Sequence, residues 1–177
     1  NELPWLHDLR ERGREAFERQ GFPGAKTEAW KYTKPRALNA DDYVMNAGRI
    51  STDSAPAELP FDGYRICFEN GVFNPSASEL PQGVIVLPLI EAVLLRGDTR
   101  QYLGRLVDLN RHPFAALNTC YVQEGAYIRI EKNVELKKPL ILINHTSAGD
   151  ENLFFNLRNL IVLEEGAAAE VVEYYHY

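Results

Sequence analysis

Residues Ala126 to Ile143 read AYIRIEKNVELKKPLILI. Around Ile128 and Ile130, apolar and polar side chains alternate, which is typical of a strand with one buried face. From Leu140 to Ile143 every residue is apolar, as in a strand covered on both faces. No amphipathic helix of convincing length follows. The stretch therefore predicts that the C-terminal part of the chain consists of strands joined by short turns.

The same order of features recurs further along the chain. Residues 130–136 (IEKNVEL) run from an apolar strand end through a charged turn into a new strand, and residues 163–169 (LEEGAAA) repeat that order. Such recurrence is typical of successive coils of a β-solenoid. Short strands at regular spacing also occur in β-sandwiches, which remain an alternative. Because the sequence stops at Tyr177 inside a strand-like run, we expect the solenoid to be truncated.

Towards the N-terminus the pattern is helical. One apolar face is formed by residues at helical spacing, namely Leu6, Leu9, Gly13, Ala16, Phe17 and Gln20. Pro4 suits an early helical position, and Gly21 followed by Pro23 is a typical helix end. The other face is charged, so this helix needs a partner surface for its stability.

Between these parts the sequence predicts a mixture of elements. Residues 40–60 are rich in Asp, Ser, Asn and Pro and predict a loop. Residues 64–68 predict a strand, and Asn70-Gly71 predicts a tight hairpin into Val72-Phe73. A strand at 84–87 and a helical stretch, interrupted near Gly97, follow. We therefore expect an α+β chain, with an N-terminal helical or mixed domain at 1–120 and the start of a β-helix at 121–177.

Bulk composition limits the class of protein. The chain has 177 residues, of which 45% are hydrophobic and 25% charged, and its net charge is −6. These values are ordinary for a globular protein, and the acidic balance argues against a dominant surface for nucleic acid or anionic membrane. Two distant cysteines, no long apolar run and a charged N-terminus together predict a cytoplasmic protein without a signal peptide.

Residues capable of metal or redox chemistry are few and scattered. Cys67 and Cys120 are far apart, and the four histidines (His7, His112, His145 and His176) form no closely spaced ligand pair. His145 and His176 would face one another if they lay on stacked coils, with Cys120 as a further candidate ligand. Packed or surface histidines and buried thiols are the better interpretation. We assign no metal ligand and no cofactor, and expect the chain alone to bind no stoichiometric metal.

No residue is assigned a catalytic role. The strand and turn carboxylates are best explained as solvated faces, and neither GxGxxG nor a phosphate-binding loop occurs. We therefore expect no hydrolase, transferase or redox activity. Large aromatic residues are interpreted as packing or interface groups, and we expect Trp30 and Tyr32 to anchor the connection that follows the first helix.

Two motifs carry a resemblance to a known family. The first is Trp30-Lys31-Tyr32-Thr33, preceded by Gly21-Phe22-Pro23 and by Glu28; here Ala29 separates the acidic residue from Trp30. The second is Phe114-Ala115-Ala116-Leu117-Asn118, followed by Gly125, by the strand at 128–130, and by Pro139 with Leu140–Leu142. On these motifs the chain, from Leu3 to its end, resembles the SufB/SufD family of scaffolds for SUF iron–sulfur cluster assembly, and its SufD members in particular.

The resemblance implies a fold and a role. Members of this family have an N-terminal helical domain, a right-handed parallel β-helix and a C-terminal helical domain that docks the ATPase SufC. The resemblance implies that this chain is a non-catalytic scaffold component that pairs with a SufB-like scaffold and a SufC-like ATPase. The regions that the family uses for ATPase docking and cluster assembly lie beyond Tyr177, so no site residue is transferred.

Two other functions stay open. One is a small β-rich binding module or cupin-like domain with a helical preface, which would be supported by clustered histidines and a downstream Glu. The other is a free-standing interaction module that recruits a partner through its aromatic N-terminal segment. A reading frame that continues past Tyr177 with further strands would favour the scaffold over both.

Overall fold

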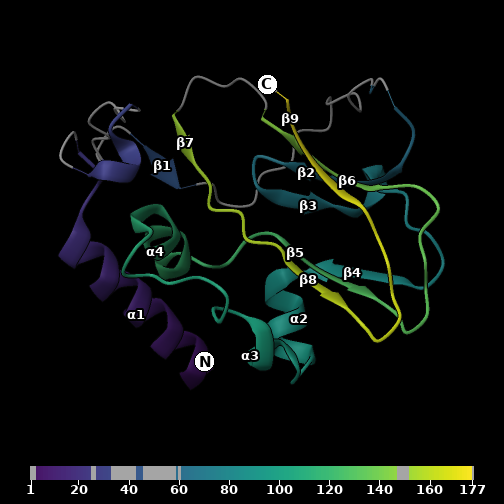
Figure 1. The fold of residues 1–177 in the computed structure, drawn as a ribbon, viewed down its shortest axis with the longest axis horizontal. Coiled ribbons are helices and arrows are strands. Elements are labelled where there is room, and N and C mark those ends of the chain that lie inside the picture. The colour runs from purple at the N-terminus through teal and green to yellow at the C-terminus, as the bar shows by residue number, and fades with distance from the viewer. Residues whose placement is uncertain are drawn as a thin grey trace. The chain divides into compact units, whose positions relative to one another are not determined.

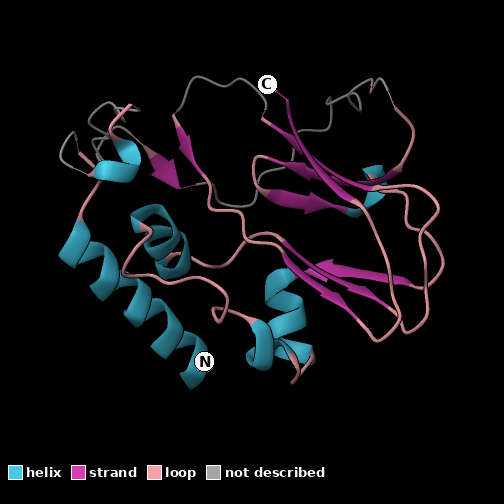
Figure 2. Cartoon of the chain, viewed as in Figure 1, coloured by secondary structure: helices cyan, strands magenta, loops and turns pink. Residues whose placement is uncertain are grey.

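A computed structural model describes residues 3–24, 27–32, 43–45, 59, 61–146 and 152–176. Figures 1 and 2 show its helices and strands. In chain order these are α1 (Pro4–Gln20), η1 (Glu28–Trp30), β1 (Val44–Met45), β2 (Tyr64–Glu69), β3 (Val72–Asn74), η3 (Pro75–Ala77), β4 (Val84–Pro88), α2 (Leu89–Leu95), α3 (Thr99–Tyr102), α4 (Pro113–Cys120), β5 (Ala126–Ile130), β6 (Leu140–His145), β7 (Leu153–Phe154), β8 (Leu160–Leu163) and β9 (Val171–His176).

The chain divides into two compact units, and both are discontinuous in sequence. The first combines Asn1–Tyr43 with Val93–Val122, and the second combines Val44–Ala92 with Gln123–Tyr177. The division after Val122 falls beside the expected boundary at residue 120. Strands β2 and β4 nevertheless belong to the unit of the later strands, because they pair with β6 and β5. Most of the loop predicted for residues 40–60 lies outside the described residues.

In the first unit, α1 packs against α4 through its predicted apolar face. Leu6, Leu9, Gly13 and Ala16 are buried. The two helices approach closely at Gly13, where a Cβ atom would lie 2.5 Å from the backbone nitrogen of Cys120. Pro4 begins the helix and Gly21 ends it, as predicted.

Polar side chains of α1 hold the segments around α4 in place. The Arg10 guanidinium donates to the carbonyl of Val122, which follows α4, with an Nη2–O distance of 2.6 Å. At the other end of the helix, Gln20 donates to the carbonyl of Leu109, at 2.6 Å. Both contacts satisfy backbone carbonyls in irregular segments, so they fix the path of the chain on either side of α4.

In the second unit, a four-stranded sheet (β3-β2-β6-β9) and a three-stranded sheet (β4-β5-β8) enclose a common core. Its buried residues come from both sheets: Ile66, Phe68, Phe73, Val84, Val86, Ala126, Ile128, Ile130, Leu140 and Leu142. The predicted burial of Leu140–Ile143 on both faces is confirmed, because Ile141 and Ile143 pack with Cys67 on the opposite face of the sheet.

Of two local predictions in this region, one is confirmed in full and the other in part. Asn70 and Gly71 both have positive φ, at 47° and 85°, and join β2 to β3 in an antiparallel hairpin. The predicted helical stretch is present in part, as α2 and α3 on either side of Gly97. Its predicted continuation over Leu106 and Val107 is wrong, because α3 ends at Tyr102 and Leu106 is 93% exposed.

Successive turns of the chain stack in parallel register. Tyr127 of β5 pairs with Leu160 of β8, 33 positions later, and an isolated bridge joins Glu135 to Ala168 at the same spacing. Strands β6 and β9 pair in parallel with a spacing of 31 positions. The chain thus returns beside itself after 31–33 residues, and the sequence echo between residues 130–136 and 163–169 corresponds to stacked positions.

The stacked turns also share a backbone conformation. Asn133 and Gly166 occupy equivalent places and both have positive φ, at 61° and 73°. A Cβ atom at Gly166 would lie 2.4 Å from Oδ1 of Asn133. Glycine at position 166 adopts this conformation without strain and leaves room for the asparagine side chain, whereas the equivalent position of the first turn holds an asparagine.

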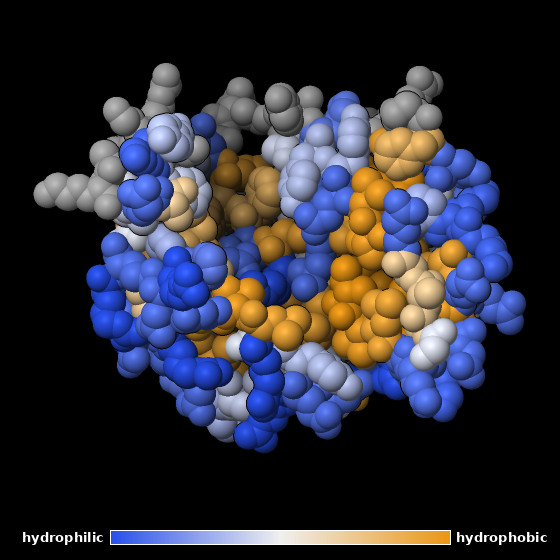
Figure 3. Space-filling model, in the orientation of Figure 1, coloured by the Kyte–Doolittle hydropathy of each residue, from blue (hydrophilic) through white to orange (hydrophobic). Residues whose placement is uncertain are grey.

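The hydrophobic interior of the second unit reaches the surface at its last strands. Leu163 of β8 is 45% exposed and Val171 of β9 is 37% exposed, although their partners Ile130 and Leu140 are fully buried. Figure 3 shows hydrophobic side chains at the surface between β8 and β9. Positions that are interior in one turn are therefore uncovered in the next.

Candidate functional site

The two sequence motifs meet in one aromatic cluster of the first unit. The Trp30 ring centroid lies 5.0 Å from that of Phe114, and Phe22 lies 6.0 Å from the same ring. Phe17 of α1 completes the row, with an edge-to-face contact to Phe22 at 5.1 Å. These are favourable distances for aromatic pairs. The first motif therefore packs directly on α4, which begins at the second motif.

Tyr32 does not share in this packing. Its side chain is 92% exposed, so the prediction that it anchors the connection is wrong. Trp30 ends the short helix η1 and turns its ring towards Phe114, whereas Tyr32 follows that helix and points to solvent. The Nζ atom of Lys31 lies 5.5 Å from the Tyr32 ring centroid.

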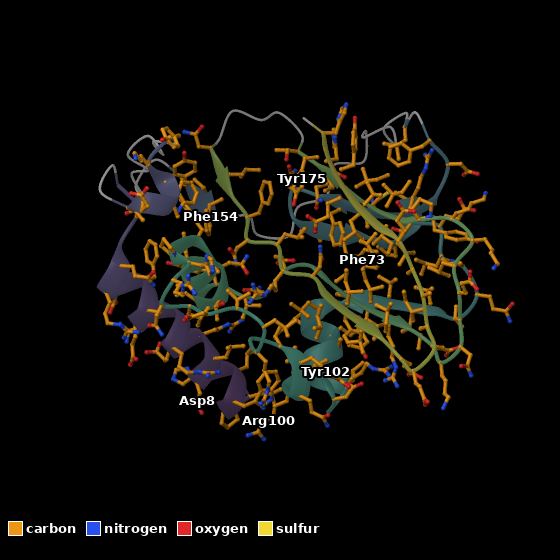
Figure 4. The ribbon with its side chains drawn as sticks, viewed as in Figure 1. Asp8, Phe73, Arg100, Tyr102, Phe154 and Tyr175 are labelled. Atoms are coloured by element: carbon orange, nitrogen blue, oxygen red, sulfur yellow. The ribbon has the colours of Figure 1, made fainter. Side chains whose placement is uncertain are left out.

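A cavity of about 630 Å³ lies in the first unit beside α1. Its lining combines three arginines with one carboxylate and an indole: Trp5, Asp8, Leu9, Arg12, Arg100, Leu103, Gly104 and Arg105. Figure 4 labels Asp8 on α1 and Arg100 on α3. All three arginines are exposed, and the cavity has a positive excess in a chain whose net charge is −6. Guanidinium groups recognise carboxylates and phosphates, so this charge favours an anionic group.

In the second unit, two histidines meet across parallel strands. His145 ends β6, His176 ends β9, and the two residues are register partners. Their Nδ1 atoms lie 3.2 Å apart, and the rings stack with centroids 5.3 Å apart. The two side chains therefore face one another from neighbouring parallel strands, as expected for residues on stacked turns. Cys120 belongs to the other unit.

The two cysteines are free thiols; Cys67 is buried and Cys120 is partly buried. Burial raises the pKa of the Cys67 thiol, which donates to the carbonyl of Ala77 at a distance of 3.1 Å. Burial is also the main cause of a raised pKa at Cys120, and the carboxylate of Glu11 adds to it. A raised pKa lowers the fraction of thiolate, which is the form that attacks electrophiles and binds metals.

Within the described ranges of the chain, no group of three or more His, Cys, Asp or Glu side chains is placed to hold a metal ion. Among the helices of those same ranges, none is both long enough and apolar enough to cross a membrane.

Sequence reasoning missed the arginine cavity, and it named the histidine pair only as a consequence of stacked coils. The arginine cavity draws on residues almost a hundred positions apart, and only the packing of α1 beside residues 100–105 brings them together. The contact between His145 and His176 follows from the sequence echo. A spacing of about one repeat between His145 and His176 places them on adjacent turns, and the terminal residues of two parallel strands then share a face.

The chain is similar in sequence to iron–sulfur cluster assembly proteins of the SufBD family. The family model described as the SufBD protein N-terminal region matches residues 1–142. The chain is 33% identical over 162 residues to an iron–sulfur cluster assembly SufBD family protein of Synechocystis, covering 87% of this chain and 35% of the relative. It is 31% identical over 160 residues to the iron–sulfur cluster assembly protein SufD of Escherichia coli, covering 89% of this chain and 36% of that protein.

A more distant relative extends the match along the chain. The iron–sulfur cluster assembly protein SufD of Bacillus subtilis is 24% identical over 185 aligned positions, covering 98% of this chain and 42% of the relative. The chain therefore spans about a third to two fifths of the length of these curated relatives.

Proposed function

The chain belongs to the SufBD family of iron–sulfur cluster assembly proteins, and from this premise we propose that it is the N-terminal part of a non-catalytic scaffold in such an assembly system. The single observation that carries the proposal is the match of the family model to residues 1–142, which includes the helical unit and the first turn of stacked strands. We further propose a SufB-like scaffold and a SufC-like ATPase as partners, and a cytoplasmic location.

We also propose that the stacked strands are the opening coils of a right-handed parallel β-helix. The parallel pairing at intervals of 31–33 residues supports this fold, because a solenoid advances by one strand layer for each turn of the chain. The uncovered apolar positions on β8 and β9 provide a surface on which a further layer can stack.

A chimera tests the proposed role. This chain replaces the matching N-terminal segment of Escherichia coli SufD, and the chimera is expressed with SufB and SufC in cells that depend on the SUF system. We expect the chimera to co-purify with both partners and to support growth. The corresponding segment of Bacillus subtilis SufD, inserted in the same way, is the matched control. A soluble, folded chimera that binds neither partner, while the control does, would overturn the proposal.

One observation favours a second role for the same region. Tyr32 projects almost fully into solvent from a segment whose neighbour Trp30 is packed, and exposed aromatic residues are enriched at protein interfaces. Recruitment of a partner through this segment predicts that Tyr32→Ala in the chimera weakens co-purification without changing its stability. Unchanged co-purification would remove this role.

A further inference from the structure

The histidine pair on the four-stranded sheet has no part in the scaffold role proposed above. His145 and His176 are the last residues of β6 and β9, which are adjacent in the sheet order β3-β2-β6-β9. Register partners on neighbouring parallel strands point to the same face, so both imidazoles leave the sheet in the same direction. Figure 4 labels Tyr175, which precedes His176 on β9.

The backbone on both sides of the pair is fixed. The amide of Thr146, the residue after His145, donates to the carbonyl of His176 with an N–O distance of 2.8 Å. Two residues earlier in each strand, Ile143 and Tyr174 are register partners that pack in one apolar cluster. The Tyr174 ring is also stacked near the His176 ring, with centroids 6.3 Å apart. The imidazoles therefore extend from a packed base towards solvent.

The distance between the two nitrogens suits a shared metal ion. Zinc–imidazole bonds are about 2.0–2.1 Å long. An ion placed equally far from two nitrogens 3.2 Å apart would make an N–metal–N angle of roughly 100°. This angle is close to tetrahedral. Each imidazole can ligate through Nδ1 when its proton is on Nε2.

We propose that His145 and His176 together bind a divalent first-row transition metal ion through their Nδ1 atoms, with water at the remaining positions. Neutral imidazole is a common ligand for zinc, copper and nickel, and the negative net charge of the chain favours a cation. This proposal replaces the expectation, drawn from the sequence, that the chain alone binds no stoichiometric metal. It does not depend on the proposed scaffold function.

Binding requires one rearrangement within the pair. In the metal-free protein the two Nδ1 atoms lie within hydrogen-bond distance, and a ring is the donor when its proton is on Nδ1. For both nitrogens to ligate, the donor ring must carry its proton on Nε2 instead, so the internal hydrogen bond is replaced by two metal bonds and the total number of protons on the neutral pair is unchanged. The ion then connects β9 to β6 through side chains in addition to the backbone.

Zinc binding to the full chain at neutral pH tests the proposal. Equilibrium dialysis and calorimetry should show one zinc ion per chain, and His145→Ala or His176→Ala should abolish this saturable binding. The matched control is His112→Ala, which removes an exposed histidine at the start of α4 and should leave zinc binding unchanged. No stoichiometric binding, or binding that survives His145→Ala, would overturn the proposal.

A second measurement separates a specific site from loosely held zinc. Amides of β9 exchange when this strand separates from β6. A ligand that binds only while the two strands are paired lowers the population of the separated form by about 100-fold, at a free concentration 100 times its dissociation constant. Zinc should therefore slow hydrogen exchange of the β9 amides in the parent and in His112→Ala, and leave it unchanged in His145→Gln, which keeps a polar side chain of similar size. Equal slowing in His145→Gln would contradict metal bridging between the two strands.

Discussion

Trp30 is the residue through which the connection after α1 is held on α4. Its ring packs on Phe114 but is only partly buried. Complete loss of a buried tryptophan costs about 3–5 kcal/mol, so we expect Trp30→Ala to lower the free energy of unfolding by roughly 1–3 kcal/mol. Tyr32→Ala is the matched control and should change it by less than about 0.5 kcal/mol. Urea unfolding followed by circular dichroism compares the midpoints, and equal midpoints for the two variants would contradict this packing.

The two cysteines give a prediction about chemical reactivity. Because burial raises the pKa of both thiols, each stays protonated at neutral pH and reacts slowly with electrophiles. Cys67 is buried and Cys120 only partly so, and we expect Cys120 to be alkylated first. Iodoacetamide labelling followed by mass spectrometry measures both rates, with Cys67→Ser and Cys120→Ser to assign them. Urea should make the rates similar, whereas rapid labelling of Cys67 in the folded chain would contradict its burial.

At the scale of residues, the sequence identified the aromatic residues that are candidates for packing, but not which of them is packed and which is exposed. Trp30 and Tyr32 are both large aromatic residues in one motif, and nothing in their spacing states which one faces the helix pair. The direction is set by η1, whose end turns Trp30 towards Phe114 and leaves Tyr32 in solvent. It therefore depends on packing with α4, more than eighty positions away in the chain.

At the scale of elements, the contact between α1 and α4 depends on Gly13. Alanine normally stabilises a helix interior by about 0.5–1 kcal/mol relative to glycine. Here the added Cβ would meet backbone atoms of Ala116, Thr119 and Cys120, so the helices must move apart. We expect Gly13→Ala to lower stability by roughly 1–3 kcal/mol, the usual cost of overpacking.

A substitution on the exposed face of the same helix provides the control for Gly13→Ala. Glu15→Ala should change the free energy of unfolding by less than about 0.5 kcal/mol, because Glu15 is exposed. Thermal and urea unfolding of both variants measure the difference. A Gly13→Ala variant at least as stable as the parent would show that helix propensity outweighs the contact, and that α1 and α4 can separate at little cost.

Elements with a strong local signal were predicted well. The face of α1 follows from helical spacing, and the hairpin at Asn70-Gly71 from residues that tolerate positive φ. Strand β6 follows from its continuous apolar run. The predictions did not include α4 as a helix, because its apolar residues from Pro113 were interpreted through a family motif and its eight residues are too few for a clear period. The antiparallel pairing of β4 with β5 also has no local signal.

For the whole molecule, the sequence echo predicted that turns of the chain stack, and the register confirms the spacing at Ile130 and Leu163. Residues 64–88 could not be assigned to the later strands from sequence, because their pairing with β5 and β6 spans intervals with no repeated pattern. The histidine site also depends on the interval between paired strands. It exists only because the interval between β6 and β9 places His176 beside His145.

The outermost strand β9 gives the last prediction. Among the described residues it pairs only with β6, and its Tyr175 side chain is 64% exposed. Unpaired strand edges with exposed apolar residues favour pairing with another chain, and charges on such an edge oppose it. We expect the chain to self-associate with rising concentration, or else to show rapid hydrogen exchange along β9.

Val171→Lys combined with Tyr175→Lys should restore a monomer, whereas the same change at Leu94 and Leu95, exposed on α2, should not. Light scattering and hydrogen exchange measure both properties. A strictly monomeric parent with strongly protected β9 amides would mean that this edge is covered within one chain, and the proposed open β-helix would be wrong.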